Sequence, residues 1–339
     1  MAAPGELGEF ALIEQVRRRL GAVGQSRRLV VGSGDDAAVT LPGGATATSI
    51  DSIVEAVHFR LETSDPAEIG HKALATALSD LAAMGAEPGE AYVALGLPDR
   101  LDAAAALALC DGLLALAARS GVALAGGDIS ASELLFVTVA VVGHADRAED
   151  FVTRSGARPG DRVLASGAFG GAAAGLAWLE RERGEAAINR GDPGLAAAVS
   201  EVIRRQRRPE PLLALGRALA PEVSAMIDIS DGLGADLGHI GAASSVAIEL
   251  EAGRIPVDPA ARRVASELEL DPEALALGGG EDYELAVTVD PPRSAAAVAA
   301  AAACGVELTE IGRVAAGGGV SLGGLSLPRT GGFEHRRGR

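Results

Sequence analysis

The 339-residue sequence predicts a mixed fold of helices and strands, α/β or α+β in class, divided into two domains near residue 150. Length is the first reason, because a domain typically has roughly 100–200 residues and a chain of this size can bury two cores. The second is the alternation of amphipathic helical patterns with short apolar runs. The third is the polar stretch 154–161, whose glycines and proline are typical of a turn or boundary.

The first half supplies enough strands for one sheet. Apolar runs predict strands near Leu29–Val31, Thr46–Ile50, Ala91–Leu97, Val122–Ala125 and Leu134–Val142. Helices are expected near Phe10–Leu20 and Leu101–Arg119. Another helix should open at Asp65-Pro66, because proline suits the first helical turn.

The second half repeats this mixture without a repeat of fixed period. Strands are predicted near Arg162–Ala165, Ser224–Ile227, Val246–Leu250 and Glu284–Val289. Helices are predicted near Gly171–Arg183, Leu195–Arg205, Pro211–Leu219 and Ser294–Cys304. The last of these is nearly all alanine, the strongest helix former.

Composition and charge narrow the classes of function. A formal net charge of −16 disfavours nucleic-acid binding, because that affinity comes mainly from Lys and Arg contacts to phosphates. The N-terminus lacks a signal-peptide pattern, and Asp111 interrupts the apolar stretch from Ala103, so no membrane segment is expected. Cys110 and Cys304 are the only cysteines, too few for a disulfide framework and not spaced for zinc. We therefore expect a cytoplasmic protein that binds anionic ligands together with cations.

Aspartates recur where predicted strands end or helices begin. Mg²⁺ prefers oxygen ligands and typically joins a few carboxylates to substrate phosphates, so the set predicts a metal–nucleotide site. Its members are Asp35, Asp36, Asp51, Asp80, Asp128, Asp228 and Asp231. An alternative holds for each of them, because aspartate is also common in turns and at helix N-caps, where it only accepts backbone hydrogen bonds.

Lys72 is the only lysine in the chain. Steps of four residues place it with Thr76 and Asp80 on nearly one helical face. A phosphate-facing role and a structural pairing with a buried carboxylate both explain its presence. His58 lies seven residues after Asp51, and a lone histidine is more often structural than catalytic.

Glycine-containing segments accompany the aspartates. In Gly32–Val39 flexible glycines can bring backbone close to a ligand. Gly126-Gly127-Asp128 follows an apolar run, and Asp228–Leu233 joins a strand to a helix whose N-terminus could face phosphate. Gly167–Gly171 does not have the G-x-G-x-x-G spacing and no Walker-type G-K-[ST] exists, so Rossmann and P-loop folds are not expected.

Taken in order, these segments resemble the thiamine-monophosphate kinase family, from about Gly5 to Phe333. That family shares a superfamily with aminoimidazole-ribotide synthetase, selenophosphate synthetase and a hydrogenase-maturation protein. The matching motifs are Gly34-Asp35-Asp36, Asp51–Phe59, Lys72–Ala86, Gly126-Gly127-Asp128, Arg154–Asp161, Asp228–Leu233 and Gly279–Leu285.

The resemblance implies an aminoimidazole-ribotide synthetase-like fold with two mixed-sheet domains. Residues 1–150 would bind ATP and Mg²⁺ and pair their sheet with that of a second subunit in a homodimer. Residues 151–339 would close the active-site cleft. The implied reaction is direct in-line phosphorylation of thiamine monophosphate by ATP, the last step of thiamine diphosphate biosynthesis, without a phospho-enzyme or a dedicated general base.

The resemblance also implies roles for particular residues. The Mg²⁺ ligands would be Asp36, Ser49, Ile50, Asp51, Asp80, Asp128, Asp228 and Asp231. The ATP contacts would be Gly127, Asp128, Arg154 and Ser230. The thiamine phosphate would meet His58, Glu281 and Phe333.

Two positions depart from the family pattern. Ile50 and Ile129 stand where threonine is usual, so Ile50 can offer a metal only its backbone carbonyl. One rival function is another ligase or synthetase of the superfamily, although the reactive N-terminal cysteine of selenophosphate synthetases and the C-terminal cysteine of the maturation protein are both lacking. The other is a non-catalytic nucleotide-binding scaffold, which the full set of aspartates disfavours.

Overall fold

The computed structural model describes residues 8–34, 37–41, 43–182 and 192–327. The chain forms two compact units, residues 1–81 with 86–148 and residues 82–85 with 149–339. Three predicted site residues, Asp35, Asp36 and Phe333, lie outside the described residues.

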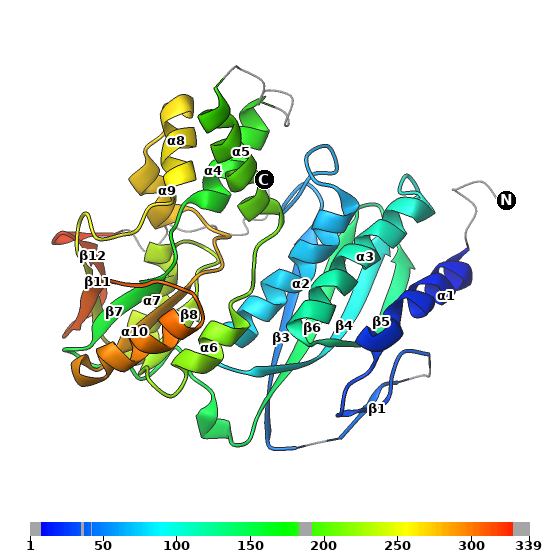
Figure 1. Ribbon diagram of the computed structural model, residues 1–339, viewed down its shortest axis with the longest axis horizontal. Coiled ribbons are helices and arrows are strands. Elements are labelled where there is room, and N and C mark those ends of the chain that lie inside the picture. The colour runs from blue at the N-terminus through cyan, green and yellow to red at the C-terminus, as the bar shows by residue number, and fades with distance from the viewer. Residues whose placement is uncertain (1–7, 35–36, 42, 183–191, 328–339) are drawn as a thin grey trace. The chain divides into compact units, whose positions relative to one another are not determined.

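The first unit is built on a four-stranded sheet in the order β3-β6-β4-β5 (Figure 1). The strands are β3 (Ala45–Val54), β4 (Glu87–Leu97), β5 (Ala123–Ala131) and β6 (Phe136–Ala145). β6 pairs antiparallel with both β3 and β4, whereas β4 and β5 are parallel. A parallel pair needs a crossover connection, which the helix α3 (Ala103–Ser120) provides. β3 and β5 are therefore the two edges of this sheet.

Two helices, α2 (Pro66–Ala83) and α3, lie side by side against this sheet (Figure 1). Glycine allows them to approach closely. A Cβ atom on Gly70 would lie 1.9 Å from the carbonyl oxygen of Leu109, and one on Gly112 would lie 1.9 Å from that of Ala67. α3 is long and apolar enough to span a membrane, but eight of its residues are buried within the protein, as in the core helix of a globular domain.

The N-terminal segment packs beside α3. The helix α1 (Glu9–Leu20) places Leu12 in a small core with Ala106 and Leu107 of α3. The short helix η1 (Gly21–Gly24) and the two-stranded arm of β1 (Leu29–Val31) and β2 (Val39–Thr40) follow.

The second unit contains a seven-stranded sheet in the order β13-β12-β9-β11-β7-β10-β8. Its pairs are antiparallel except for β12 with β9. The strands are β7 (Arg162–Ser166), β8 (Ala225–Asp228), β9 (Ala247–Leu250), β10 (Leu285–Val289), β11 (Leu308–Ala315), β12 (Gly319–Leu322) and β13 (Leu325–Ser326). All five residues of β10 are buried, as expected for an inner strand.

The helices of the second unit are α4 (Gly171–Glu182), α5 (Pro193–Arg207), α6 (Leu213–Leu219), α7 (Leu233–Ser244), α8 (Pro259–Leu268), α9 (Pro272–Gly278) and α10 (Ser294–Ala303), with short turns η2 (Ala148–Asp150) and η4 (Pro291–Arg293). Three of them begin with an Asp-Pro pair, in which the aspartate caps the helix and the proline occupies its first turn. The capping side chains are Asp192, Asp258 and Asp271.

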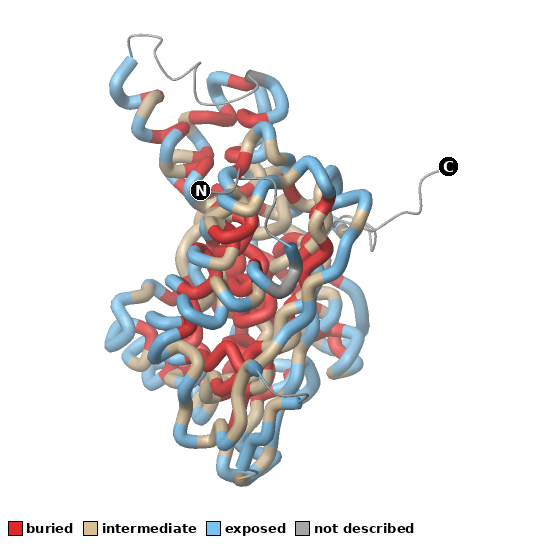
Figure 2. Tube along the Cα trace, turned by 90° about the vertical axis from the view of Figure 1, so that its right-hand side faces the viewer, coloured by how far each residue is buried: buried red, intermediate tan, exposed pale blue. Residues whose placement is uncertain are grey.

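Among the described residues of the second unit, two groups of buried side chains hold it together (buried residues are red in Figure 2). One lies between the sheet and α7 and includes Phe169 and Ile229, both fully buried. The other joins α4, α5 and α8 around Trp178. Burying an aromatic side chain of this size contributes a large part of the stability of such a core.

The predicted elements lie close to their observed positions, with one correction that bears on the site. Asp51 and Asp128 were expected just beyond strands, but both lie inside them, in β3 and β5. The apolar runs stop earlier than the strands because edge strands tolerate polar residues.

Candidate functional site

A group of oxygen donors gathers where β3 faces α2. Ser49 donates a hydrogen bond from its hydroxyl to the carboxylate of Asp80. Asp51 follows Ser49 by two residues in the same strand, so its side chain lies on the same face of the sheet. All three residues are partly buried. Two carboxylates and a hydroxyl are the ligand types that Mg²⁺ prefers, so these residues fit such an ion.

Ile50 points to the other face. Its side chain is 68% exposed. The structure therefore leaves only the backbone carbonyl of Ile50 as a possible metal ligand.

His58 and Lys72 are linked in the same unit. The backbone N–H of Val54 donates to His58 Nδ1 at 3.0 Å. Because Nδ1 is an acceptor there, the neutral ring carries its proton on Nε2. The buried Lys72 donates from Nζ to the carbonyl oxygen of His58 at 3.3 Å. Lys72 thus holds the backbone that carries His58.

Gly127 and Asp128 lie on the opposite edge of the sheet from Asp51. Asp51 pairs with Val139, Val139 with Val93, and Val93 with Gly127, so one row crosses the sheet. Three strand spacings make that row about 14 Å long. Asp128 comes next along β5, and strand alternation turns its side chain to the other face. Within one chain, Asp128 and Asp51 are therefore not brought together.

A cavity of about 120 Å³ adjoins Gly127 and Asp128. Its walls come from α1, α3, β4 and β5 and are mostly apolar, with Val16, Leu109 and Leu113 among them. Cys110 also lines it, and burial, together with the nearby charge of Asp111, raises the pKa of its thiol to about 11. The cavity thus combines an apolar interior with a polar glycine-rich wall.

The second unit brings together another part of the predicted site. The backbone N–H of Glu281 donates to the carbonyl oxygen of Ser230 at 2.8 Å, and that of Tyr283 donates to Ile229 at 2.9 Å. These bonds place Glu281 beside Ser230 and Asp231. Glu281 and Tyr283 have φ angles of 67° and 51°. Such left-handed conformations are costly for side chains of this size and often occur at functional sites.

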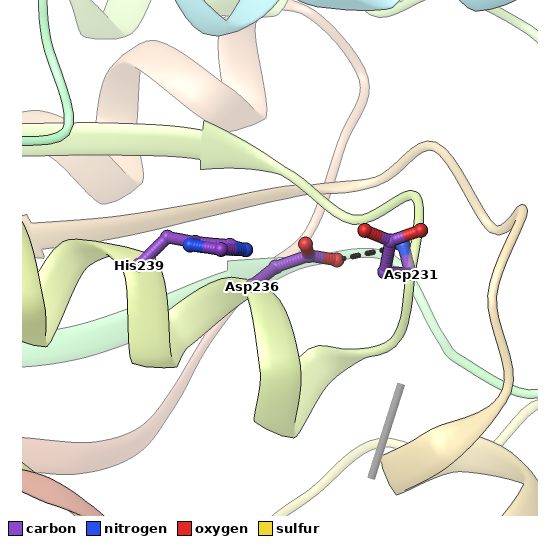
Figure 3. A group of neighbouring side chains, drawn as sticks. All are labelled: Asp231, Asp236 and His239. Carbon is purple, nitrogen blue, oxygen red and sulfur yellow. Dashed lines mark hydrogen bonds between the residues drawn. The ribbon is translucent and has the colours of Figure 1, made fainter. Parts of the chain in front are cut away.

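Asp236 organises the turn that precedes α7 (Figure 3). Its Oδ2 accepts hydrogen bonds from the backbone N–H groups of Ser230, Asp231 and Gly232 at 3.0, 3.0 and 3.1 Å. A side chain of the helix thus accepts the hydrogen bonds of the three amides that precede α7, while the prediction that the N-terminus of α7 itself faces phosphate stays a prediction. Burial raises the pKa of Asp236 to about 7, although the three amides oppose this.

A possible metal site lies at this turn (Figure 3). One potential ligand atom from each of Asp231, Asp236 and His239 lies within 4.8 Å of the other two. Asp228, the remaining predicted ligand of this unit, is buried at the end of β8. This unit therefore also offers carboxylates suited to a divalent cation.

The loop that carries Arg154 is fixed by Ser244 of α7. The Ser244 hydroxyl accepts hydrogen bonds from the N–H groups of Gly156 and Ala157 and donates to the carbonyl oxygen of Arg154, each at 3.2 Å. Arg154 itself is exposed. Its guanidinium can therefore reach a ligand while its backbone stays in place.

Two half-buried acidic residues, Asp282 and Glu284, follow Glu281 in the sequence. Asp282 accepts from the N–H groups of Gly170 and Ala172 at 2.7 and 3.2 Å, and burial raises its pKa to about 7. Burial also raises the pKa of Glu284, despite a 2.5 Å hydrogen bond from Ser166. These bonds tie the strained loop around Glu281 to the start of α4.

Asp236, Ser244 and Asp282 were missed by sequence reasoning. Asp236 had a signal, since an aspartate one turn into a helix that follows Ser-Asp-Gly is well placed to accept backbone N–H bonds. Ser244 and Asp282 act on segments 90 and 112 residues away, at Arg154 and Gly170, and no spacing rule predicts such contacts.

Comparison with known proteins gives a consistent result. The family model "AIR synthase related protein, N-terminal domain" matches residues 34–145, and the corresponding C-terminal domain model matches residues 158–324. A thiamine-monophosphate kinase of Escherichia coli K12 is 39% identical, covering 96% of this chain and 94% of the relative. One from Mycobacterium tuberculosis H37Rv is also 39% identical, covering 83% and 80%.

Solved structures show the same likeness. The crystal structure of thiamine-monophosphate kinase from Stenotrophomonas maltophilia K279a has a TM-score of 0.83 and 36% identity, covering 95% of this chain and 98% of that one. A structure described as AaThiL complexed with AMPPCP and TMP has a TM-score of 0.76 and 31% identity, covering 99% of both chains.

Proposed function

This chain belongs to the thiamine-monophosphate kinase family of AIR synthase related proteins, and we propose that it transfers the γ-phosphoryl group of ATP to thiamine monophosphate, giving thiamine diphosphate and ADP. The observation that carries the proposal is the group of Ser49, Asp51 and Asp80, an all-oxygen site in a chain similar to these kinases over nearly its whole length. A cytoplasmic location accords with this reaction.

Mg²⁺ is the proposed metal. Ser49, Asp51, Asp80 and the carbonyl of Ile50 would hold it in the first unit, and Asp128, Asp228 and Asp231 are further proposed ligands, together with Asp36. When bound, Mg²⁺ neutralises the charge of the phosphates that react. The protein needs such an ion because a chain with a formal net charge of −16 otherwise repels two anionic substrates.

The residues of the chain position the acceptor. His58, with its proton on Nε2, is a hydrogen-bond donor suited to the phosphate of thiamine monophosphate. Glu281, in its strained loop, offers a carboxylate suited to the cationic thiazolium ring, and Phe333 is the proposed aromatic contact. Because the attacking atom is a phosphate oxygen that is largely ionised at neutral pH, no side chain has to remove a proton from it.

The nucleotide would bind along the glycine-rich edge of the first sheet. The apolar cavity next to Gly127 and Asp128 suits the adenine base. Arg154 and Ser230 are the proposed phosphate contacts of the second unit. Arg154 fits this role because it is exposed while Ser244 fixes its backbone.

A homodimer completes the proposal. Asp51 and Asp128 occupy opposite edges of the sheet, so a second copy would supply Asp128 to the Asp51 of its partner. The face of the sheet opposite α2 supports such pairing, because Ile50 is 68% exposed there and Ser52 and Thr138 share a 2.7 Å hydrogen bond on it. A sheet face of this kind is suited to packing against its own copy.

The decisive experiment incubates the purified protein with ATP and thiamine monophosphate, with and without Mg²⁺, and measures thiamine diphosphate by chromatography. Thiamine and aminoimidazole precursors serve as control acceptors. We expect product from thiamine monophosphate alone, and only with Mg²⁺. Turnover of an aminoimidazole precursor would favour another superfamily synthetase, and ATP binding without any turnover would favour the scaffold.

A further inference from the structure

One face of α1 lines the apolar cavity of the first unit. Ile13, Val16, Arg17 and Leu20 recur at the three- and four-residue steps that place side chains on a single helical face, and all four line the cavity. Arg17 therefore lines the cavity from the same face of α1 that contributes apolar side chains to the lining.

The position of α1 is fixed from the other side. Leu12 is buried against Ala106 and Leu107 of α3. Arg19 donates from Nε to Asp111 Oδ1 at 3.0 Å, which links the last turn of α1 to the middle of α3. These contacts hold α1 in one rotation about its axis, with Arg17 toward the cavity.

The guanidinium of Arg17 lies directly against Gly34. A Cβ atom on Gly34, whose φ is +123°, would lie 2.2 Å from Arg17 Nη2. Gly34 precedes Asp35-Asp36 in the sequence, and Asp36 is a proposed metal ligand. The Arg17 ion pair with Glu14 is loose, at 4.0 Å, and both side chains are about half exposed. Among the described residues, the guanidinium is thus held beside Gly34 and is tied only loosely to Glu14.

Among the described residues that line the cavity, Arg17 carries the positive charge and Asp128 the negative charge. The cavity, at about 120 Å³, is smaller than the roughly 300–1,000 Å³ of pockets that enclose a whole drug-sized ligand. A nucleotide would therefore place its base inside the cavity and its phosphates outside, beyond Gly127 and Asp128. Arg17 lies in the lining of the cavity and beside Gly34.

We propose that Arg17 is a phosphate contact for the nucleotide, additional to Arg154 and Ser230; this inference rests on the proposed function. A guanidinium is always charged and presents a planar set of donors that matches phosphate oxygens. Its charge also offsets part of the repulsion between the polyphosphate and a strongly acidic protein.

The test compares Arg17→Gln with Arg18→Gln. Arg18 is the neighbouring residue of α1, is 73% exposed and contacts the same Glu14, at 3.1 Å, so it is a matched control. Calorimetry with Mg²⁺ would measure the affinity of each variant for AMPPCP, a non-hydrolysable ATP analogue, and for adenosine. We expect Arg17→Gln to weaken AMPPCP binding by about tenfold or more, as for a lost charge-assisted hydrogen bond, and to leave adenosine binding unchanged.

Each other outcome has a definite meaning. Equal AMPPCP affinities for Arg17→Gln and Arg18→Gln would overturn the assignment. An equal loss for AMPPCP and adenosine would do the same, because it would place the effect at the base or in the fold of α1. An unaltered protein that binds no AMPPCP would instead remove the proposed function, and this inference with it.

Discussion

Asp51 and Asp128 lie on opposite edge strands of one four-stranded sheet and on opposite faces of it. One chain therefore cannot bring these two carboxylates to a common ion without large distortion of the sheet. If both serve the same reaction, the second must come from another copy of the chain.

Mixing two inactive variants tests this arrangement. We expect Asp51→Asn and Asp128→Asn each to lose turnover while staying folded, since each removes a proposed metal ligand. Unfolding and refolding an equal mixture should restore about a quarter of normal activity, because half of the dimers are mixed and each mixed dimer holds one intact site. Thiamine diphosphate formation measures the recovery. Activity no higher than that of the separate variants would exclude a site shared between copies.

The hydrogen bond from Ser49 to Asp80 should set metal affinity. Ser49→Ala removes a proposed Mg²⁺ ligand whose hydroxyl also orients Asp80, so we expect Mg²⁺ affinity to fall by about 10- to 100-fold. Ser52→Ala is the matched control, because Ser52 lies on the same strand but its hydroxyl bonds Thr138 on the other face. Titrating activity against Mg²⁺ concentration separates the two. A similar Mg²⁺ dependence for both variants would show that Ser49 has only a structural role.

Cys110 lines the cavity, so the rate at which its thiol is labelled measures access to the cavity. Burial raises its pKa to about 11, so little thiolate is present at neutral pH and we expect slow reaction with a maleimide. In a Cys304→Ser background, AMPPCP with Mg²⁺ should slow this labelling further by covering the cavity. Mass spectrometry over time gives the rate. Labelling that is indifferent to AMPPCP would place the base of the nucleotide elsewhere.

The half-buried Asp282 should make stability depend on pH. Its folded pKa of about 7 exceeds the ordinary value of 3.8, so the folded state keeps a proton that the unfolded state releases. Stability contributed by this group is thus lost as pH rises from about 4 to about 7, by an amount on the order of 4 kcal/mol at most. Asp282→Asn stays neutral, and its free energy of unfolding should fall less between pH 5 and pH 8.

Urea unfolding at the two pH values measures this difference. Asp99→Asn, in an exposed turn, is the control and should show the same pH dependence as the unaltered protein. The dependence will not vanish in Asp282→Asn, because burial also raises the pKa values of Glu284 and Asp236. An unchanged slope would mean that Asp282 stays ionised when folded.

The sequence located most strands and helices because their apolar periodicity is set by the core. The predicted ends of elements were wrong, and some elements were missed, where the apolar periodicity is weak. β3 continues past Ile50 through polar residues, and α8 and α9 went unpredicted although each begins with Asp-Pro, because their apolar stripes are short. Strand β11 was also missed, since its polar and small residues dilute the alternation of apolar ones.

For the site, the sequence identified residue types better than their arrangement. Ser49 and Asp80 do come together, with Asp51 on the same face of β3, as do Ser230, Asp231 and Glu281. Spacing along the chain did not show that Asp128 faces away from Asp51, because that depends on strand register. It also did not show that Asp236 accepts the hydrogen bonds of the backbone N–H groups before α7, because that depends on the direction of one side chain.

The backbone at Glu281 and Tyr283 has a consequence for the evolution of the chain. Each left-handed φ costs on the order of 1 kcal/mol or more, and glycine would relieve it. A mutation that raises heat resistance is therefore available at Glu281, whereas at Tyr283 the loss of a buried ring would outweigh the relief of strain. Selection for heat resistance alone would favour glycine at 281, whereas selection for catalysis would keep the carboxylate, so this loop is a place where stability and activity compete.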